Sequence, residues 1–346
     1  MNIVVLAGGL SPERDVSLSS GAMAANALRS RGHHAILVDL FFGVESLPTP
    51  ISKAFEETGE LPPRPVPAQA PDLNAIRAQR KSGFSPAIGN GVLELCRAAD
   101  ITYLALHGDC GENGTLQAFF DLSGVRYTGS PSIGCALAMD KYITKCLLDG
   151  AGILTPRGVM LHKGDEIHMA DLPMPCVVKP CCGGSSIGIS IVHTADELEK
   201  ALADAFAYEN IVLVEEYVQG HELSAGVLGG EALPLIEIVP KHGFYDYQHK
   251  YQPGWTDEIT PARFDADTTA RIQALAVRGF HTLQLSVYAR LDFLLTDDGR
   301  AYCLEANTLP GMTPTSLLPQ EAAAIGIDYP SLCNKVIALS MEKYQH

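Results

Sequence analysis

The strongest constraint on the fold is a stretch near the C-terminus in which two apolar, alternating runs flank Asp298-Gly299. An Asp-Gly dipeptide between such runs predicts a β-hairpin closed by a two-residue type I′ turn. In that register Asp292 lies opposite Glu305, and Arg290 lies opposite Asn307. All four side chains then lie on one side of the ribbon, because strand side chains repeat with a period of two.

This register predicts a metal site. Two carboxylates directly opposite each other repel and need a positive charge nearby. Asp292 and Glu305 with the amide oxygen of Asn307 form a set of hard oxygen ligands that suits Mg²⁺. The alternative is an ion pair of Arg290 with Glu305 on a solvated face, since structural ion pairs are common. The irregular, glycine- and proline-marked loop after Asn307 favours the metal site, because binding groups are often displayed on such loops.

The N-terminal part predicts a βαβ unit with a parallel sheet. An apolar strand at residues 3–6 is followed by a turn, a helical pattern over 15–29 and a second strand at 35–40. Prolines crowd residues 43–90, which predicts a surface insertion with one short helix instead of a sheet. A buried strand at 101–106 and helices at 115–122 and 140–149 follow.

The second half predicts a mainly antiparallel α+β domain. Closely spaced strand patterns occupy residues 176–179, 187–192, 211–216, 222–228 and 232–239, with helical patterns at 196–207 and 265–285. We therefore expect an N-terminal α/β domain over residues 1–140 and a second domain over residues 141–340.

Composition narrows the class of ligand. The chain has 346 residues, with 40 acidic and 25 basic side chains and a net charge of −15. Such a charge argues against nucleic acid or an anionic membrane as the main partner and favours a small ligand. No apolar run reaches the roughly 18 residues that span a bilayer, and the start lacks a basic signal region, so we expect a cytoplasmic protein. The 9 cysteines show no CxxC spacing and are expected to be reduced.

A glycine-rich segment follows the strand that ends at Lys179. It contains Cys181-Cys182 and two glycines before Ser185-Ser186, but no lysine follows and the next pattern is a strand, so it is not a Walker loop. We interpret it as a hairpin flap whose backbone and hydroxyl groups bind phosphate, although a plain β-turn is the alternative. Lys179 and Lys141 are candidates to neutralise phosphates, although isolated lysines are most often surface charges.

Two further segments are candidate binding elements. Glu215-Glu216 ends a strand and Glu222 follows closely, so these carboxylates are candidates to bond an exocyclic amine and ribose hydroxyls. The alternative is that they are simply solvated. Residues 244–251, Phe-Tyr-Asp-Tyr-Gln-His-Lys-Tyr, are too polar for a core and predict a lid.

Together these motifs resemble the D-alanine–D-alanine ligase family of the ATP-grasp superfamily. The resemblance covers nearly the whole chain except residues 43–90, and it depends on seven motifs in order. The motifs are Gly8-Gly9 with Glu13, Ser17 and Gly21; His107-Gly108 with Gly111-Glu112 and Gly114; Met139-Asp140-Lys141; residues 183–188; residues 244–251; Arg290-Leu291-Asp292; and residues 305–313.

The resemblance implies a Rossmann-like N-terminal domain followed by a two-lobed ATP-grasp domain. It implies a role for each matching residue. Two Mg²⁺ ions, or Mn²⁺ in their place, would be held by Asp292, Glu305 and Asn307. ATP would be held by Lys141, Lys179, Ser186, Glu215, Glu222, Phe244 and Lys250. The first D-alanine would be oriented by Glu13, Ser185 and Tyr251, with His107 nearby, and the oxyanion and second substrate would be bound by Arg290, Gly311, Ser316 and Leu317.

The implied reaction joins two D-alanines for peptidoglycan precursor synthesis. The first carboxylate attacks the γ-phosphorus of ATP to give an acyl phosphate, and the amine of the second D-alanine then displaces phosphate. The resemblance also implies a homodimer. Alternatives are a ligase that accepts D-serine or D-lactate, a ligase for another amino acid, and a nucleotide-binding regulator without turnover. The presence of Lys250-Tyr251 favours an amine acceptor.

The chain departs from the family pattern in three places. Cys181 and Cys182 stand where the family usually has polar or basic residues, so the flap is expected to hold phosphate mainly through backbone N–H groups. Asn113 replaces a usual aspartate, which we interpret as a structural change. The insertion at residues 43–90 has no family role that we assign.

Overall fold

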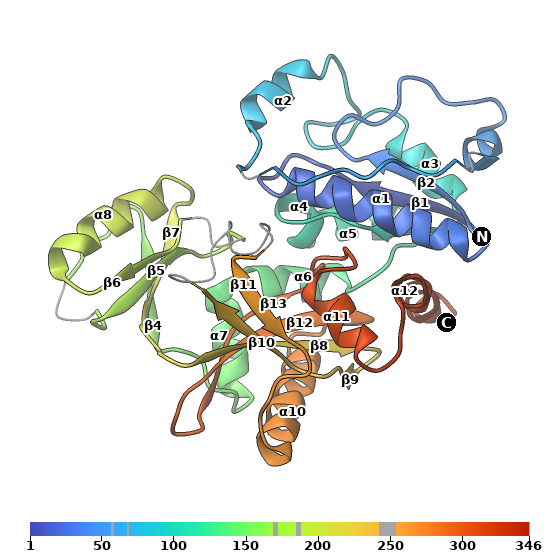
Figure 1. The fold of residues 1–346 in the computed structure, drawn as a ribbon. Helices are drawn as coiled ribbons and strands as arrows, with labels where there is room; N and C mark the ends of the chain where they lie inside the picture. The colour runs from blue at the N-terminus through green and yellow to red at the C-terminus, as the bar shows by residue number, and fades with distance from the viewer. Residues whose placement is uncertain (57–58, 68, 169–171, 185–187, 242–253, 346) are drawn as a thin grey trace.

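The computed structural model describes residues 1–346 except 57–58, 68, 169–171, 185–187, 242–253 and 346. Three sheets follow one another along the chain, and Figure 1 shows them as three neighbouring lobes. The sequence-based fold class, a parallel βαβ unit followed by antiparallel sheets, is confirmed.

The N-terminal sheet is parallel, with the strand order β2-β1-β3. It comprises β1 (Asn2–Ala7), β2 (His34–Asp39) and β3 (Ile101–Leu104). Helix α1 (Arg14–Ser30) connects β1 to β2 and packs on the sheet. The residues of β1 from Ile3 onward are buried, as expected of a central parallel strand that is covered on both faces.

The two ends of the proline-rich insertion lie next to each other at the edge of the N-terminal domain. Gly43 and Asn90 form an isolated parallel bridge. A side chain on Gly43 would collide with the backbone of Asn90, and the φ of Gly43 is 68°, so glycine is required there. Between these points lie a 3₁₀ helix, η1 (Ile51–Glu56), and the short helix α2 (Leu73–Gln79). The predicted surface insertion with one short helix is close to what is observed.

Helix α3 (Val92–Ala98) leads from the insertion into β3. After β3, short helices lead to the next lobe: α4 (Asp109–Glu112), α5 (Thr115–Ser123), α6 (Ser132–Met139) and α7 (Lys141–Gly150). The side chain of Asp140 accepts a hydrogen bond from the backbone N–H of Ile143 and so caps the start of α7. This cap fixes where Lys141 enters the helix.

The second sheet is antiparallel, with the order β4-β7-β5-β6. Its strands are β4 (Gly158–His162), β5 (Cys176–Pro180), β6 (Ser190–Val192) and β7 (Ile211–Glu216). Helix α8 (Ala195–Phe206) begins with a capping box formed by Thr194 and Glu197 and buries its apolar side against this sheet.

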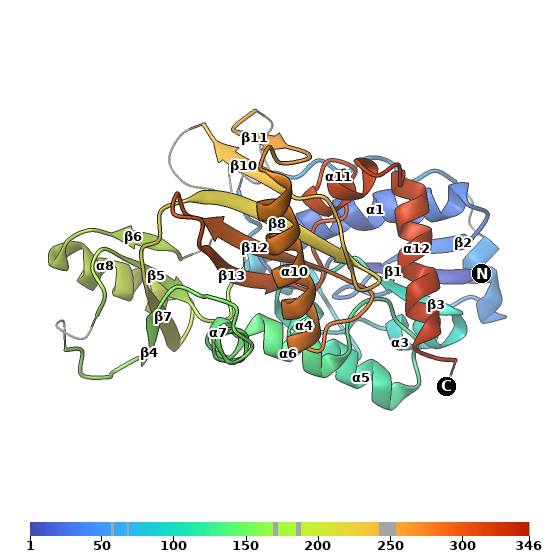
Figure 2. The ribbon, with the colours of Figure 1, turned by 90° about the horizontal axis from the view of Figure 1, so that it is seen from below.

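The third sheet is also antiparallel and includes the path β11-β10-β8-β12-β13, with β9 paired to β8. Its strands are β8 (His221–Leu228), β9 (Glu231–Ala232), β10 (Ile236–Pro240), β11 (Thr256–Ile259), β12 (Tyr288–Leu295) and β13 (Ala301–Asn307). Helix α10 (Ala266–Thr282) covers one face of it (Figure 2). The predicted strand 232–239 is wrong as a single strand, because Pro234 lies in the break between β9 and β10 and has no N–H to donate.

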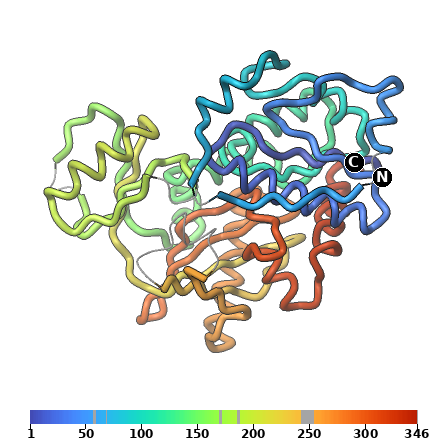
Figure 3. Tube along the Cα trace, turned by 45° about the horizontal axis from the view of Figure 1, so that its top comes forward, coloured from blue at the N-terminus to red at the C-terminus, as the bar shows by residue number. Residues whose placement is uncertain are grey.

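Two C-terminal helices complete the molecule. They are α11 (Leu317–Ala323) and α12 (Tyr329–Glu342). Leu332, Val336 and Ile337 of α12 belong to the same buried cluster as the N-terminal sheet. The tube in Figure 3 shows the blue and red ends of the chain close to each other. Among the described helices, none combines the length and the apolar character needed to cross a bilayer.

The packing of α1 on the first sheet gives a stability prediction. A Cβ at Gly21 would lie 2.6 Å from the Cβ of Ala7 and 2.9 Å from Leu37 Cδ1. We expect Gly21→Ala to lower the free energy of unfolding by about 1–3 kcal/mol, because overpacking outweighs the gain in helix propensity.

Gly150, at the exposed end of α7, is the matched control because a Cβ there would meet nothing within 4 Å. Urea denaturation of both alanine variants measures the difference. Equal stability of Gly21→Ala and Gly150→Ala would contradict the close packing of α1.

Candidate functional site

The hairpin of β12 and β13 has the predicted pairing but not the predicted turn. Asp292 lies opposite Glu305, and Arg290 lies opposite Asn307. The loop, however, has three residues, since Thr296 N–H donates to Arg300 O and Gly299 has a φ of 83°. The register shifts between Asp292 and Phe293, where Leu304 is the extra residue of a β-bulge. The two-residue turn is therefore wrong, and the bulge restores the predicted pairing.

The facing carboxylates are compensated by cations in the structure. Arg290 Nε and Nη2 each donate to Asp292 at 2.8 Å, and Asn307 Nδ2 donates to Asp292 Oδ2 at 3.1 Å. Lys141 Nζ lies 3.7 Å from Glu305 Oε2. Arg290 thus forms an ion pair with Asp292, whereas the alternative from the sequence was a pair with Glu305. The predicted metal ligands are brought together on one face.

A cavity of about 490 Å³ lies between the second and third sheets, and we call it the inter-sheet cavity. Apolar and charged side chains both line it, and the apolar ones include Val177, Ile191, Val218, Ile238, Leu294 and Leu304. A cavity with this mixed lining suits a largely apolar ring with a polar tail.

The predicted ATP ligands within the described residues all line this cavity. They are Lys141, Lys179, Glu215 and Glu222, and they share it with Asp292 and Glu305. Residues from six separate elements of the chain, α7, β5, β7, β8, β12 and β13, therefore line one cavity, as the sequence-based assignment requires. Their roles toward a nucleotide are not tested by the geometry alone and stay predictions.

Glu215 is held by two buried lysines. Its carboxylate lies 2.6 Å from Lys179 Nζ and 2.7 Å from Lys145 Nζ, and the residue is 2 % exposed. Burial alone would raise the pKa of Glu215, but the two ammonium groups outweigh burial and lower the pKa. Burial lowers the pKa of Lys145. Lys145 was missed in the sequence, although it lies four residues after Lys141 and so on the same side of α7.

A second cavity, of about 700 Å³, lies between α1 and the loop after β13, and we call it the N-terminal cavity. Glu13, His107, Arg290 and Gly311 line it together with Ser316 and Leu317. These are the described residues that the sequence assigned to the substrates. Glu305 lines both cavities, so the predicted metal site lies at their junction.

Two titratable groups also line the N-terminal cavity, the buried His107 and the half-buried Glu112. His107 Nδ1 lies 2.9 Å from Leu309 O, and burial lowers the pKa of His107 although the charge of Glu13 opposes the shift. Glu112 accepts hydrogen bonds from the N–H groups of Gly108 at 2.7 Å and Leu309 at 3.1 Å. Burial and the nearby charge of Glu13 raise the pKa of Glu112. Through these two hydrogen bonds Glu112 connects the segment after β3, at Gly108, to the loop after β13, at Leu309. The sequence motif around Glu112 did not indicate this structural role.

A third buried acid, Glu321, lies under the third sheet. Ser224 Oγ donates to Glu321 Oε1 at 2.8 Å, and Ser224 is the ladder partner of Asp292 on β8. A side chain at Gly226 would collide with Glu321 Oε2. Glu321 therefore connects α11, which follows Ser316, to the strand beside the predicted metal site. Burial raises the pKa of Glu321 to about 8.

Five predicted site residues lie outside the described residues. They are Ser185, Ser186, Phe244, Lys250 and Tyr251. The structure describes the first part of the predicted flap, up to Gly184. These residues contact other residues of the site. Lys141 Nζ donates to Gly183 O, and both Gly183 and Gly184 line the inter-sheet cavity.

Glu321 gives a prediction on pH dependence. The folded protein holds a proton on Glu321 up to about pH 8, whereas an unfolded glutamate releases it near 4.5, so this group's contribution to stability falls as pH rises between those values. Glu321→Gln keeps the acceptor for Ser224 and removes the titration. We expect the variant to gain stability relative to the natural protein as pH rises from about 5 to 8.

Urea denaturation at several pH values measures this difference, with Glu342→Gln as a control for removing a surface carboxylate. A constant difference between Glu321→Gln and the natural protein across the range would contradict the buried, protonated state.

Comparison with known proteins agrees with the geometry. The family models for D-ala D-ala ligase match residues 2–130 with the N-terminal model and residues 153–338 with the C-terminal model. The chain is 43% identical to the D-alanine–D-alanine ligase of Pediococcus pentosaceus over 350 residues, with 99% of each chain covered. It is 41% identical to that of Lacticaseibacillus casei over 347 residues, covering 99% of this chain and 97% of the relative.

Solved structures are similar along the whole chain. The D-alanine–D-alanine ligase of Bacillus anthracis complexed with ATP has a TM-score of 0.76 at 28% identity, covering 99% of this chain and 98% of that one. The VanG D-Ala:D-Ser ligase of Enterococcus faecalis has a TM-score of 0.75 at 30% identity, covering 98% and 100%. The family expected from the sequence motifs is thereby confirmed, and this chain belongs to the D-alanine–D-alanine ligase family.

Proposed function

We propose that this protein joins two D-alanines to D-alanyl-D-alanine with cleavage of ATP to ADP and phosphate. The observation that carries the proposal is the position of Glu305 at the junction of two cavities, with Asp292 on one side and Arg290 on the other. Full-length relatives at 41% and 43% identity are D-alanine–D-alanine ligases, which supports the same reaction here. The product would serve peptidoglycan synthesis.

The inter-sheet cavity fits ATP. Its apolar walls would hold the adenine ring, and Lys141 and Lys179 would face the phosphates. The carboxylate of Glu215 contacts both Lys145 and Lys179, so we assign to it the role of orienting Lys179. Glu215 would also form part of the edge of the cavity. Glu222 also lines this cavity and would bond the ribose hydroxyls.

The junction fits divalent metal. Two carboxylates and one amide on the same face supply the oxygen ligands that Mg²⁺ prefers, so Asp292, Glu305 and Asn307 would hold the ions. Bound there, Mg²⁺ would supply positive charge beside the phosphates. The hairpin already places the two carboxylates opposite each other, and bound ions would replace the hydrogen bonds that Arg290 and Asn307 donate to Asp292.

The N-terminal cavity would hold the amino acids. Glu13 would bind the ammonium group of the first D-alanine, whose carboxylate attacks the γ-phosphorus of ATP. Arg290 and the Gly311 N–H would stabilise the oxyanion when the second amine attacks the acyl phosphate. Ser316 and Leu317, at the start of α11, would bind the carboxylate of the second substrate.

No covalent protein intermediate is needed for this reaction. Phosphorylation turns a poor electrophile into an acyl phosphate with a good leaving group, and the protein mainly positions the reactants. Water must be kept from that intermediate. The predicted closing elements are residues 181–188, which lie partly outside the described residues, and residues 244–251, which lie wholly outside them, so their closure stays a prediction. The homodimer and the cytoplasmic location also stay predictions.

The identity of the second substrate, which accepts the acyl group, is tested by the mass of the product. Purified protein is incubated with ATP, Mg²⁺, D-alanine and, separately, D-serine or D-lactate, and the products are identified by mass spectrometry. We expect D-alanyl-D-alanine as the main product, with ADP formed in equal amount.

D-serine is the alternative acceptor that a specific observation supports, because a D-Ala:D-Ser ligase is among the structural relatives. Exclusive formation of D-alanyl-D-serine would overturn the proposed acceptor. Binding of ATP without release of ADP when all substrates are present would overturn the catalytic function and favour a regulator.

A further inference from the structure

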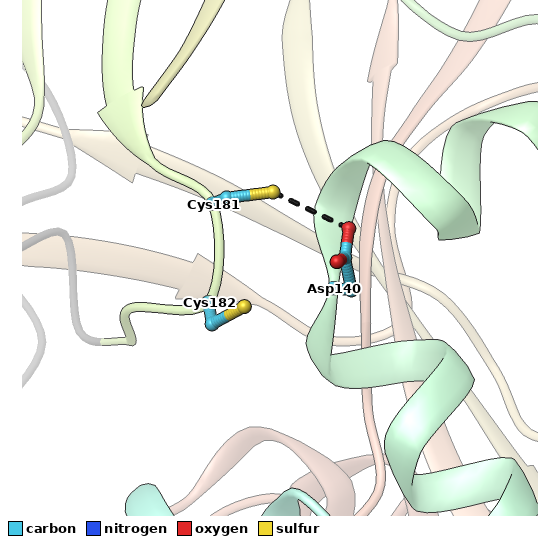
Figure 4. Close-up of side chains that lie close together, drawn as sticks. All are labelled: Asp140, Cys181 and Cys182. Atoms are coloured by element: carbon cyan, nitrogen blue, oxygen red, sulfur yellow. Dashed lines mark hydrogen bonds between the residues drawn. The ribbon is translucent and has the colours of Figure 1, made fainter. Parts of the chain in front are cut away.

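Two adjacent cysteines at the start of the glycine-rich segment lie next to the first turn of α7. Cys181 Sγ lies 3.3 Å from Asp140 Oδ1, and Figure 4 shows both sulfur atoms on the side of the segment that faces α7. The two sulfurs and an oxygen of Asp140 all lie within 4.8 Å of one another. Cys181 is buried and Cys182 is exposed, so the cluster has one fixed ligand and one that opens to solvent.

We propose that Cys181, Cys182 and Asp140 form a binding site for a thiophilic divalent cation, with Zn²⁺ as the best fit. Zinc binds sulfur at about 2.3 Å and carboxylate oxygen at about 2.0–2.2 Å in tetrahedral sites, which places neighbouring ligands about 3.5–3.8 Å apart. Cys181 Sγ and Asp140 Oδ1, 3.3 Å apart, are already close to this spacing, and the exposed side chain of Cys182 would rotate to bring its sulfur to the same distance. A water molecule would complete the tetrahedron from the solvent side.

The ligand chemistry separates this site from the predicted magnesium site. Thiolates select zinc-like ions over Mg²⁺, whereas Asp292, Glu305 and Asn307 offer only oxygen. Binding replaces the protons of both thiols, so one Zn²⁺ with two neutral thiols gives the bound ion and two released protons.

The backbone around the site connects it to Lys141. The N–H of Lys141 donates to Cys181 O at 3.1 Å, and Lys141 Nζ donates to Gly183 O. Asp140 also caps α7 through the N–H of Ile143. A cation held between Asp140 and the two cysteines would therefore cross-link the start of α7 to the glycine-rich segment. Lys141, which contacts the same segment at Cys181 O and Gly183 O, would lie beside this cross-link.

The consequence for nucleotide binding depends on the proposed function. Lys141 is one of the groups assigned to the ATP phosphates, and the cross-link would hold its ammonium group on Gly183 O. Zn²⁺ at this site would therefore weaken ATP binding while Mg²⁺ occupies the oxygen site. The segment would thus act as an inhibitory site for zinc-like ions.

The binding step is tested without any substrate. Protein freed of metal with a chelator and kept reduced with a phosphine is titrated with Zn²⁺ by calorimetry, in the presence of excess Mg²⁺. We expect one high-affinity ion for the natural protein and at least about tenfold weaker binding for Cys182→Ser. Titration in two buffers of different ionisation enthalpy measures the released protons.

Cys146→Ser is the matched control, because Cys146 is also an exposed free cysteine on α7 but lies outside the cluster. It should bind Zn²⁺ as the natural protein does. Equal Zn²⁺ affinity in the natural protein and Cys182→Ser would overturn the proposed site. Because this readout needs no turnover, it stands whether or not the protein proves to be a ligase.

The coupling is tested by the affinity for ATP with and without Zn²⁺ at saturating Mg²⁺. We expect Zn²⁺ to lower the ATP affinity of the natural protein and of Cys146→Ser, but not that of Cys182→Ser. An ATP affinity that Zn²⁺ lowers equally in all three proteins, or in none, would overturn the inhibitory role.

Discussion

The face-to-face placement of Asp292 and Glu305 is the constraint on which the rest of the site depends. Two carboxylates on adjacent strands need positive charge close by, and the structure supplies it from two directions. Arg290 lies on the same strand as Asp292, and Lys141 reaches Glu305 from the start of α7. Charge compensation thus draws the hairpin, α7 and the glycine-rich segment toward one point, which is also where the two cavities meet.

Much of this arrangement was predictable because it follows from local patterns. The βαβ order, the antiparallel sheets and the Asp292–Glu305 pairing all depend on alternation and turn residues. The hairpin also shows the limit of such reasoning. The Thr296 hydroxyl donates to Asp298 Oδ1 and to Arg300 O across a three-residue loop, and the bulge at Leu304 restores the register. Inside an apolar run, nothing marks Leu304 as the extra residue.

The features that were missed depend on contacts between distant segments. Lys145 matters because β7 brings Glu215 to it, and Glu321 matters because α11 packs against Ser224. A lysine on a helix and a glutamate in an alanine-rich helix have no local signature of burial. Likewise, the C-terminal helix α12 packs on the N-terminal core. The residues that it contacts there lie more than 200 residues earlier in the chain.

The most direct test of the central claim is Mn²⁺ binding measured by electron paramagnetic resonance in the presence of ADP. The natural protein is compared with Glu305→Gln and with Asp297→Asn, which removes an exposed carboxylate from the loop of the same hairpin. The facing carboxylates predict that Glu305→Gln loses bound Mn²⁺ while Asp297→Asn retains it. Equal Mn²⁺ binding by all three proteins would contradict a metal site between Asp292 and Glu305.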